Sequence, residues 1–227
     1  MTTLLFWDID GTLLTTRRAG IFAWEAAASD AAGRPVDLQT LQTAGLTDFA
    51  VGRAILDSLG LAFGDGPLAR IVRTYEEMLP SVLPRCQGRV LDGVRDILER
   101  ARAERSDIGL YLLTGNTHVG ARAKLTHYGL VDFFQGGAFA NSVGDRADIA
   151  RRALAIATEG GQVELERVFV IGDTPHDVAC GRAIGAKTIA VASGDYSTAA
   201  LQAELPWRAL PALPDAETFF ALLEGQA

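Results

Sequence analysis

The sequence predicts an α/β fold, a doubly wound parallel sheet of the Rossmann-like kind, with an all-helical segment inserted near its start. Short apolar runs alternate with helix-period segments along most of the chain, which is typical of parallel strands covered by helices on both faces. Residues 15–87 interrupt this alternation, because their hydrophobic residues recur only with the spacing of helices. The length of 227 residues corresponds to about 1.5 domains, which fits one core with a large insertion or two small domains.

Four short runs rich in Val, Ile, Leu and aromatic residues are expected to be strands buried on both faces of the sheet. They are residues 3–7, 108–113, 167–171 and 187–192. The helical segments that follow these strands are 93–105, 117–129, 147–158, 177–184 and 215–223. From this order we expect residues 1–14 and 88–227 to form one Rossmann-like core.

Residues 15–87 are expected to form a helical cap domain. Hydrophobic periodicity predicts helices at 19–32, 48–59 and 67–79. Gly33 and Gly60 stand where such helices commonly end. No strand is expected in this segment.

Composition excludes several classes of protein. Hydrophobic residues make up 48% and charged residues 22%, which is ordinary for a globular protein and unlike a disordered one. The net charge of −7 argues against a nucleic-acid partner, whose binding surface would be basic. Two cysteines are too few for a disulfide framework. We see no secretory leader and no apolar stretch of the ~20 residues that a membrane span needs, so we expect a cytoplasmic monomer or homodimer with no membrane partner.

The first predicted strand ends in Asp8-Ile9-Asp10-Gly11-Thr12. Carboxylates two residues apart on extended chain point to the same side, and Gly11 permits a tight turn that exposes backbone N–H groups. Two close carboxylates repel unless one holds a proton or a cation lies between them. The pattern suits a nucleophile beside a general acid, or a Mg²⁺ site, although a strand-ending turn rich in Asp and Gly explains it as well.

The second motif follows another predicted strand, where Thr114 is succeeded by Gly115, Asn116 and Thr117. A helix begins there, and helix N-termini bind anions through their free N–H groups. Asn116 or Thr117 could instead be a plain N-cap. The motif is therefore a candidate anion site or a helix cap.

In the third motif, Gly172-Asp173 ends another predicted strand, so the Asp173 carboxylate can reach the edge of the sheet. Thr174 fits an N-cap, Pro175 the first helical position and Asp177 the third, so Asp177 could be a capping carboxylate, which is compatible with a role beside a metal. All three motifs stand at the carboxyl ends of predicted parallel strands, the edge at which α/β sheets bind ligands.

With these motifs the sequence resembles the haloacid dehalogenase superfamily, and within it the phosphoglycolate-phosphatase-like branch with a helical cap. The resemblance implies a phosphatase that acts on a small phosphorylated metabolite through an aspartyl-phosphate. It implies that Asp8 is the nucleophile and Asp10 the general acid and base. It also implies Mg²⁺ held by Asp8, the backbone carbonyl of Asp10 and Asp173. Asp177 would orient these ligands.

The family normally uses a lysine to hold the nucleophile and the phosphate together, and lysine is scarce here. Lys124 and Lys187 are the only lysines, and neither is expected at a suitable place. Arg146, at a helix start, is the best substitute, with Arg151 second, although a surface position would explain Arg146 too. The residues expected to bind phosphate are Gly11, Thr114, Gly115, Asn116 and Arg146.

Other reactions of the family fit this sequence less well. A dehalogenase lacks the second Asp of the first motif, and a phosphonoacetaldehyde hydrolase needs a cap lysine, which residues 15–87 do not contain. A phosphosugar mutase uses a histidine after the first motif, whereas the histidines here are His118, His127 and His176. Phosphosugar mutase chemistry and a non-catalytic aspartyl-phosphate switch are kept as alternatives.

The cap gives little guidance on the substrate. Arg17, Thr47 and Asp48 are candidate contacts, although roles at a helix surface explain such residues as well. The segment has seven Arg against eight Asp or Glu, so it carries no basic funnel that would favour a carboxylated substrate.

Overall fold

The computed structural model describes residues 2–61, 64–142, 144, 146–159, 161 and 163–225. Its centre is a six-stranded parallel sheet in the order β5-β4-β1-β6-β7-β8. The strands are β1 (Thr3–Trp7), β4 (Ile108–Thr117), β5 (Gly136–Ala140), β6 (Val168–Gly172), β7 (Lys187–Val191) and β8 (Arg208–Leu210). This confirms the predicted α/β class.

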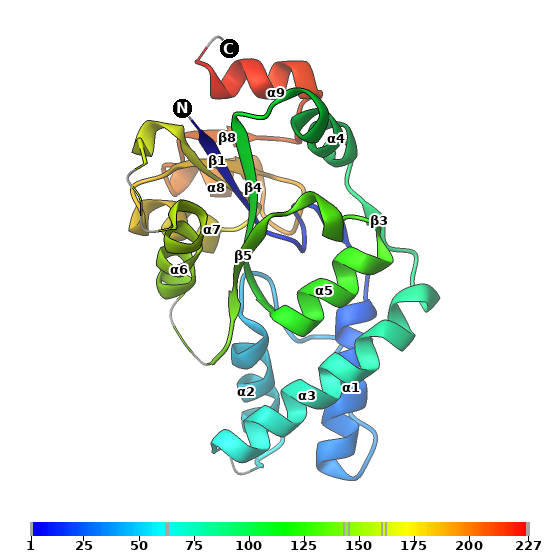
Figure 1. Ribbon diagram of the computed structural model, residues 1–227. Helices are drawn as coiled ribbons and strands as arrows, with labels where there is room; N and C mark the ends of the chain where they lie inside the picture. The colour runs from blue at the N-terminus through cyan, green and yellow to red at the C-terminus, as the bar shows by residue number, and fades with distance from the viewer. Residues whose placement is uncertain are drawn as a thin grey trace.

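Alternate residues of each central strand enter opposite hydrophobic layers. In β1, Leu5 and Trp7 belong to one buried cluster, and Leu4 and Phe6 belong to the other. The first layer is covered by α4 (Val94–Glu104), α5 (His118–His127) and α9 (Ala216–Leu223), and the second by α6 (Arg146–Thr158) and α7 (Pro175–Ala183). Figure 1 shows α6 and α7 on one side of the sheet, with α4 and α5 on the other. A sheet buried on both faces explains why its central strands read as unbroken apolar runs.

Three helices of the inserted segment gather at one end of the molecule, away from both termini (Figure 1). They are α1 (Ala19–Ala32), α2 (Asp48–Ser58) and α3 (Asp65–Val82), and α3 is followed by a 3₁₀ turn, Leu83–Arg85. These helices have their own buried cluster. Within it the rings of Trp24 and Tyr75 stack at 4.0 Å and 5°, an arrangement that contributes about 0.5–1.5 kcal/mol beyond area burial.

The inserted segment joins the sheet through a short antiparallel ribbon. Strand β2 (Leu14–Thr15) pairs with β3 (Arg89–Val90). The sequence predicts no strand at Thr15, because a two-residue ribbon carries no periodicity. The limits of 15–87 as a domain remain a prediction.

Three elements of the core also differ from expectation. Strand β5 reads Gly-Gly-Ala-Phe-Ala, with none of the β-branched residues that predict strands. Strand β8 has three residues and lies at the sheet edge. The six-residue helix α8 (Thr198–Ala203) is too short for a clear helical period.

Candidate active site

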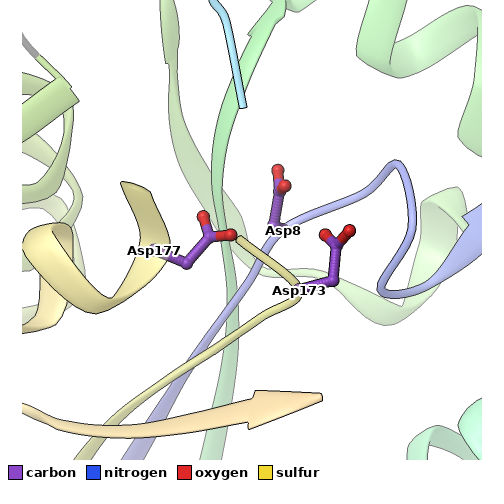
Figure 2. A group of neighbouring side chains, drawn as sticks. All are labelled: Asp8, Asp173 and Asp177. Atoms are coloured by element: carbon purple, nitrogen blue, oxygen red, sulfur yellow. The ribbon is translucent and has the colours of Figure 1, made fainter. Parts of the chain in front are cut away.

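Three aspartates from separate parts of the sequence meet at the carboxyl ends of β1 and β6 (Figure 2). Asp8 follows β1, Asp173 follows β6, and Asp177 reaches over from the first turn of α7. One carboxylate oxygen from each lies within 4.8 Å of the other two, and all three residues are buried. The structure thus brings the first and third motifs together.

Burial and mutual repulsion make this cluster electrostatically unfavourable on its own. Burial, followed by the negative charge of Asp177, raises the pKa of Asp8 to about 7. Burial, followed by the charges of Asp177 and Asp8, raises the pKa of Asp173 to about 9. A divalent cation among the three would relieve this repulsion. Carboxylate oxygens are also the ligands that Mg²⁺ prefers, so the residues fit a metal of this type.

Asp177 is more firmly held by the protein than its two neighbours. Its Oδ2 accepts hydrogen bonds from the backbone N–H and the hydroxyl of Thr174, at 3.0 and 2.7 Å. Its Oδ1 accepts one from Arg146 at 2.7 Å. Thr174 is the helix N-cap and Pro175 begins α7, which confirms the predicted cap. With both oxygens engaged, Asp177 is better suited to orienting other groups than to binding a metal directly.

Arg146 lies inside this site. Besides its bond to Asp177, its guanidinium is 3.9 Å from Asp8 Oδ2 and donates to the carbonyl of Gly45 at 2.9 Å. Burial lowers the pKa of Arg146, but the charges of Asp177 and Asp8 outweigh it and raise the pKa above its usual value. Arg151, by contrast, is exposed and pairs with Asp148. The structure therefore places Arg146, and not Arg151, next to the predicted nucleophile.

The second motif forms a network with Asp10. Asn116 donates from Nδ2 to Asp10 Oδ2 and to Thr114 Oγ1, both at 2.9 Å. Thr114 in turn makes a side-chain hydrogen bond that lowers the pKa of Asp8. Asn116 Oδ1 accepts a hydrogen bond from Lys124 Nζ at 2.5 Å, and the same Nζ lies 2.5 Å from Asp10 Oδ2. Lys124, for which the sequence analysis expects no suitable place, therefore lies at the site, where it contacts Asp10.

Lys124 could have been found from helical periodicity. In α5 the buried residues are Gly120, Ala121, Lys124 and Leu125, a spacing that places all four on one face. A lysine in that stripe must find a buried partner, and the preceding strand ends at the site. The loop after β7 was also missed: Ser193 Oγ donates to the Gly11 carbonyl at 2.6 Å.

Glycines leave room for the Asp173 carboxylate. Gly11 has φ +82°, and a Cβ there would lie 2.3 Å from Asp173 Oδ2. A Cβ on Gly194 would lie 1.8 Å from the same oxygen. The backbone N–H of Gly11 donates to the Leu14 carbonyl at 2.9 Å, so it is not free to bind phosphate as the sequence suggested. The contribution of Gly11 is space for Asp173.

A cavity of about 500 Å³ opens over these groups. Asp8, Asp10, Lys124, Arg146 and Asp173 line it from the core side. The inserted helices contribute the opposite wall, which includes Arg17, Arg18, Trp24, Asp48, Val51 and Tyr75. The site is therefore enclosed between the sheet edge and the helical segment.

Two of the three candidate substrate contacts lie at this cavity. Arg17 lines it and has φ +49°, a conformation uncommon for a residue with a side chain. Asp48 also lines it, but its Oδ2 accepts the backbone N–H of Thr117 at 2.7 Å. Thr47 is not among the lining residues: it is buried, and its hydroxyl caps α2 by accepting the N–H of Ala50. The structure gives Thr47 a capping role.

Residues 5–182 match the sequence model of the haloacid dehalogenase-like hydrolases. The chain belongs to this family. It is 26% identical over 208 residues to the probable phosphatase IndB of Dickeya dadantii (strain 3937). The aligned region covers 91% of this chain and 88% of that protein.

Two solved structures resemble the chain over its whole length. A protein described as a predicted phosphoglycolate phosphatase from Haemophilus somnus 129pt has a TM-score of 0.75 and 14% identity, covering 100% of this chain and 98% of its own. One assigned as a β-phosphoglucomutase from Thermotoga maritima has a TM-score of 0.64 and 20% identity, with both chains fully covered. These likenesses show a shared fold.

Among the described residues, no helix is both long and apolar enough to cross a membrane.

Proposed function

We propose that this hydrolase is a Mg²⁺-dependent phosphomonoesterase that cleaves a small phosphorylated metabolite through a phosphorylated Asp8. The observation that carries the proposal is the convergence of Asp8, Asp10, Asp173 and Arg146 on one cavity. Its volume of about 500 Å³ suits a small molecule. The relative named a probable phosphatase supports the same reaction.

In this proposal the substrate phosphate contacts both Asp8 and Arg146, which both line the cavity. An Asp8 carboxylate oxygen attacks phosphorus and forms a new P–O bond, while the bond from phosphorus to the leaving alcohol breaks. Asp10 gives its proton to that alcohol oxygen. Asp10 then takes a proton from a water molecule that attacks the phosphorylated Asp8, which releases inorganic phosphate and restores both carboxyl groups.

The other residues bind and orient. Asp8 and Asp173 would hold the Mg²⁺, with Asp177 orienting them. The bound ion would supply positive charge that offsets the charge of the phosphoryl oxygens. Arg146 would grip those oxygens with its planar guanidinium, which cannot lose its proton. Thr114, Gly115 and Asn116 are proposed to complete the phosphate site. Gly115 lies where the β4–β5 register is interrupted, so its N–H lies outside the regular ladder.

The inserted helices are proposed to choose the leaving group and exclude water, as a cap domain would. Arg17 is the candidate contact that the cavity supports best, because it lines the wall opposite the carboxylates. Trp24 and Tyr75 add aromatic surface beside it.

The proposal is tested with an aryl phosphate in the presence and absence of Mg²⁺. We expect metal-dependent hydrolysis that Asp8→Asn abolishes and that Asp57→Asn, at an exposed position of α2, leaves unchanged. Asp10→Asn should accumulate phosphorylated protein, seen as a mass gain of one phosphoryl group, because the aryl leaving group needs little acid but water activation needs the base. Wild-type turnover by Asp8→Asn would remove Asp8 as the nucleophile.

A further inference from the structure

Lys124 is a charged group buried in the junction between the sheet and the inserted helices. Only 4% of the residue is exposed. Burial lowers its pKa, but the charge of Asp10, followed by those of Tyr75 and Asp48, outweighs burial and raises the pKa above the usual value. Asp48 belongs to α2 and Tyr75 to α3, so the ammonium faces groups from both parts of the chain.

A buried ammonium is an unfavourable way to fill space. Its desolvation costs several kcal/mol, and an ion pair often stabilises a protein no better than well-packed apolar residues. The neighbours on the same face of α5, Ala121 and Leu125, are apolar. The charge of Lys124 on this buried face of α5 is therefore better explained by the group that Lys124 orients than by a contribution to stability.

What Lys124 holds is one particular oxygen of Asp10. Lys124 Nζ lies 2.5 Å from Oδ2, and Asn116 Nδ2 donates to the same Oδ2 at 2.9 Å. Lys124 also binds the Asn116 side chain at Oδ1, which fixes the direction of the amide. Within the part of the chain that the structure describes, no hydrogen bond to Asp10 Oδ1 is formed. Asp10 lines the cavity and 42% of its side chain is exposed.

The two donors at Asp10 Oδ2 determine which oxygen of Asp10 holds the proton when this carboxyl group is protonated. A protonated carboxyl group has one carbonyl oxygen, a good acceptor, and one hydroxyl oxygen, which donates. Because Lys124 and Asn116 both present N–H groups to Oδ2, the carbonyl form belongs at Oδ2. The proton then belongs on Oδ1, the oxygen to which none of the described residues donates.

We propose that Lys124 is a positioning residue that, together with Asn116, fixes Asp10 so that Oδ1 transfers the proton to and from the reacting groups. This inference rests on the proposed function, in which Asp10 is the general acid and base. Without Lys124, Asp10 would turn among several rotamers and present either oxygen. The loss would concern proton transfer and leave attack by Asp8 largely intact.

The test compares Lys124→Met with Lys187→Met, the other lysine of the chain. Lys187 lies over the rings of Phe169 and Trp207 at the far end of β7. Each variant is assayed with an aryl phosphate and with a simple alkyl phosphate, whose leaving group needs protonation far more. General acid–base catalysis contributes about 10²–10⁴-fold. We therefore expect Lys124→Met to lose at least tenfold more kcat/KM on the alkyl phosphate, with Lys187→Met unchanged in this ratio and Lys124→Arg restoring part of it.

Each outcome has one reading. Equal losses of kcat/KM on both substrates would show a structural role and overturn the inference while leaving the proposed function in place. If the wild-type protein does not hydrolyse the aryl phosphate, the proposed function is overturned and the inference with it. Lys124→Gln, which keeps a polar group in this space, carries the test if Lys124→Met does not fold. Failure of both to fold would assign Lys124 to stability and overturn the inference as well.

Discussion

Replacing Gly194 by alanine should displace the Asp173 carboxylate without disturbing the backbone. Gly194 lies in the loop after β7, and its φ is outside the left-handed region. Its added Cβ would stand 1.8 Å from Asp173 Oδ2.

The magnitude follows from the displacement that this contact demands. Real Cβ contacts are essentially never shorter than 3.0 Å, so Asp173 Oδ2 and Cβ must separate by more than 1 Å relative to the structure. A misplacement of about 1 Å costs on the order of 100-fold in rate. That loss corresponds to about 2.7 kcal/mol of transition-state stabilisation. Because Asp173 is a proposed metal ligand, Mg²⁺ affinity should fall as well.

The assay measures kcat/KM for an aryl phosphate over a range of Mg²⁺ concentrations, with Mg²⁺ binding followed separately by calorimetry. The matched control is Gly66→Ala in α3, where an added Cβ meets nothing within 4 Å. The control should be as active as wild type and slightly more stable, since alanine is favoured over glycine in a helix. Folded Gly194→Ala protein with wild-type metal affinity and kcat/KM would refute the reasoning.

Three further outcomes are expected. Arg146→Ala should lower kcat/KM about 10²–10³-fold, as loss of a buried donor to a developing charge does, whereas Arg151→Ala should change it less than twofold; similar losses in both would remove Arg146 from the phosphate site. Thr47→Ala should lower the unfolding free energy by about 1 kcal/mol through loss of the α2 cap with kcat/KM little changed, and a large rise in KM instead would return Thr47 to the substrate site. The pKa of Asp107 in the folded protein is lowered, first by its hydrogen bond to Arg105. Asp107 therefore stabilises the fold at pH values above its unfolded pKa near 3.8. This stability is lost as the pH falls through the lower folded pKa. Asp107→Asn should therefore reduce stability at neutral pH by less than about 1 kcal/mol, measured by urea unfolding, with the difference shrinking below pH 3.8; a difference that grows on acidification would contradict the sign.

The sequence predicted four of the six strands of the sheet and the acidic residues at their ends, because both leave local signals. An unbroken apolar run with an Asp directly after it, as at Asp8, or one residue further on, as at Asp173, indicates a strand buried on both faces and its carboxyl end. The cap of α7 was readable from Thr174 to Asp177 for the same reason. In each case the residues that define the feature are neighbours in the chain.

The parts that the sequence did not predict depend on contacts between distant residues. Strand β5 is held by its pairing with β4, and nothing in its small residues requires extension. The Gly11 N–H is engaged because the turn after β1 brings it to the carbonyl of Leu14. The five-residue motif does not include Leu14 and so does not reveal this contact. The position of Lys124 along the chain does not indicate that it lies at the site, whereas its position on the buried face of the helix does. The face of α5 turns it towards Asp10, 114 residues earlier.

The ribbon of β2 and β3 brings the two ends of the helical segment together. Leu14 pairs with Val90 and Thr15 with Arg89, so the chain leaves the core and returns to it at adjacent points. A tight turn could bridge those points in place of all three helices, with the β1–β4 pairing untouched. Variation in this segment would therefore reshape one wall of the cavity while the carboxylates on the sheet keep their positions. Under the proposed function, the choice of leaving group and the phosphoryl chemistry could then change independently of each other.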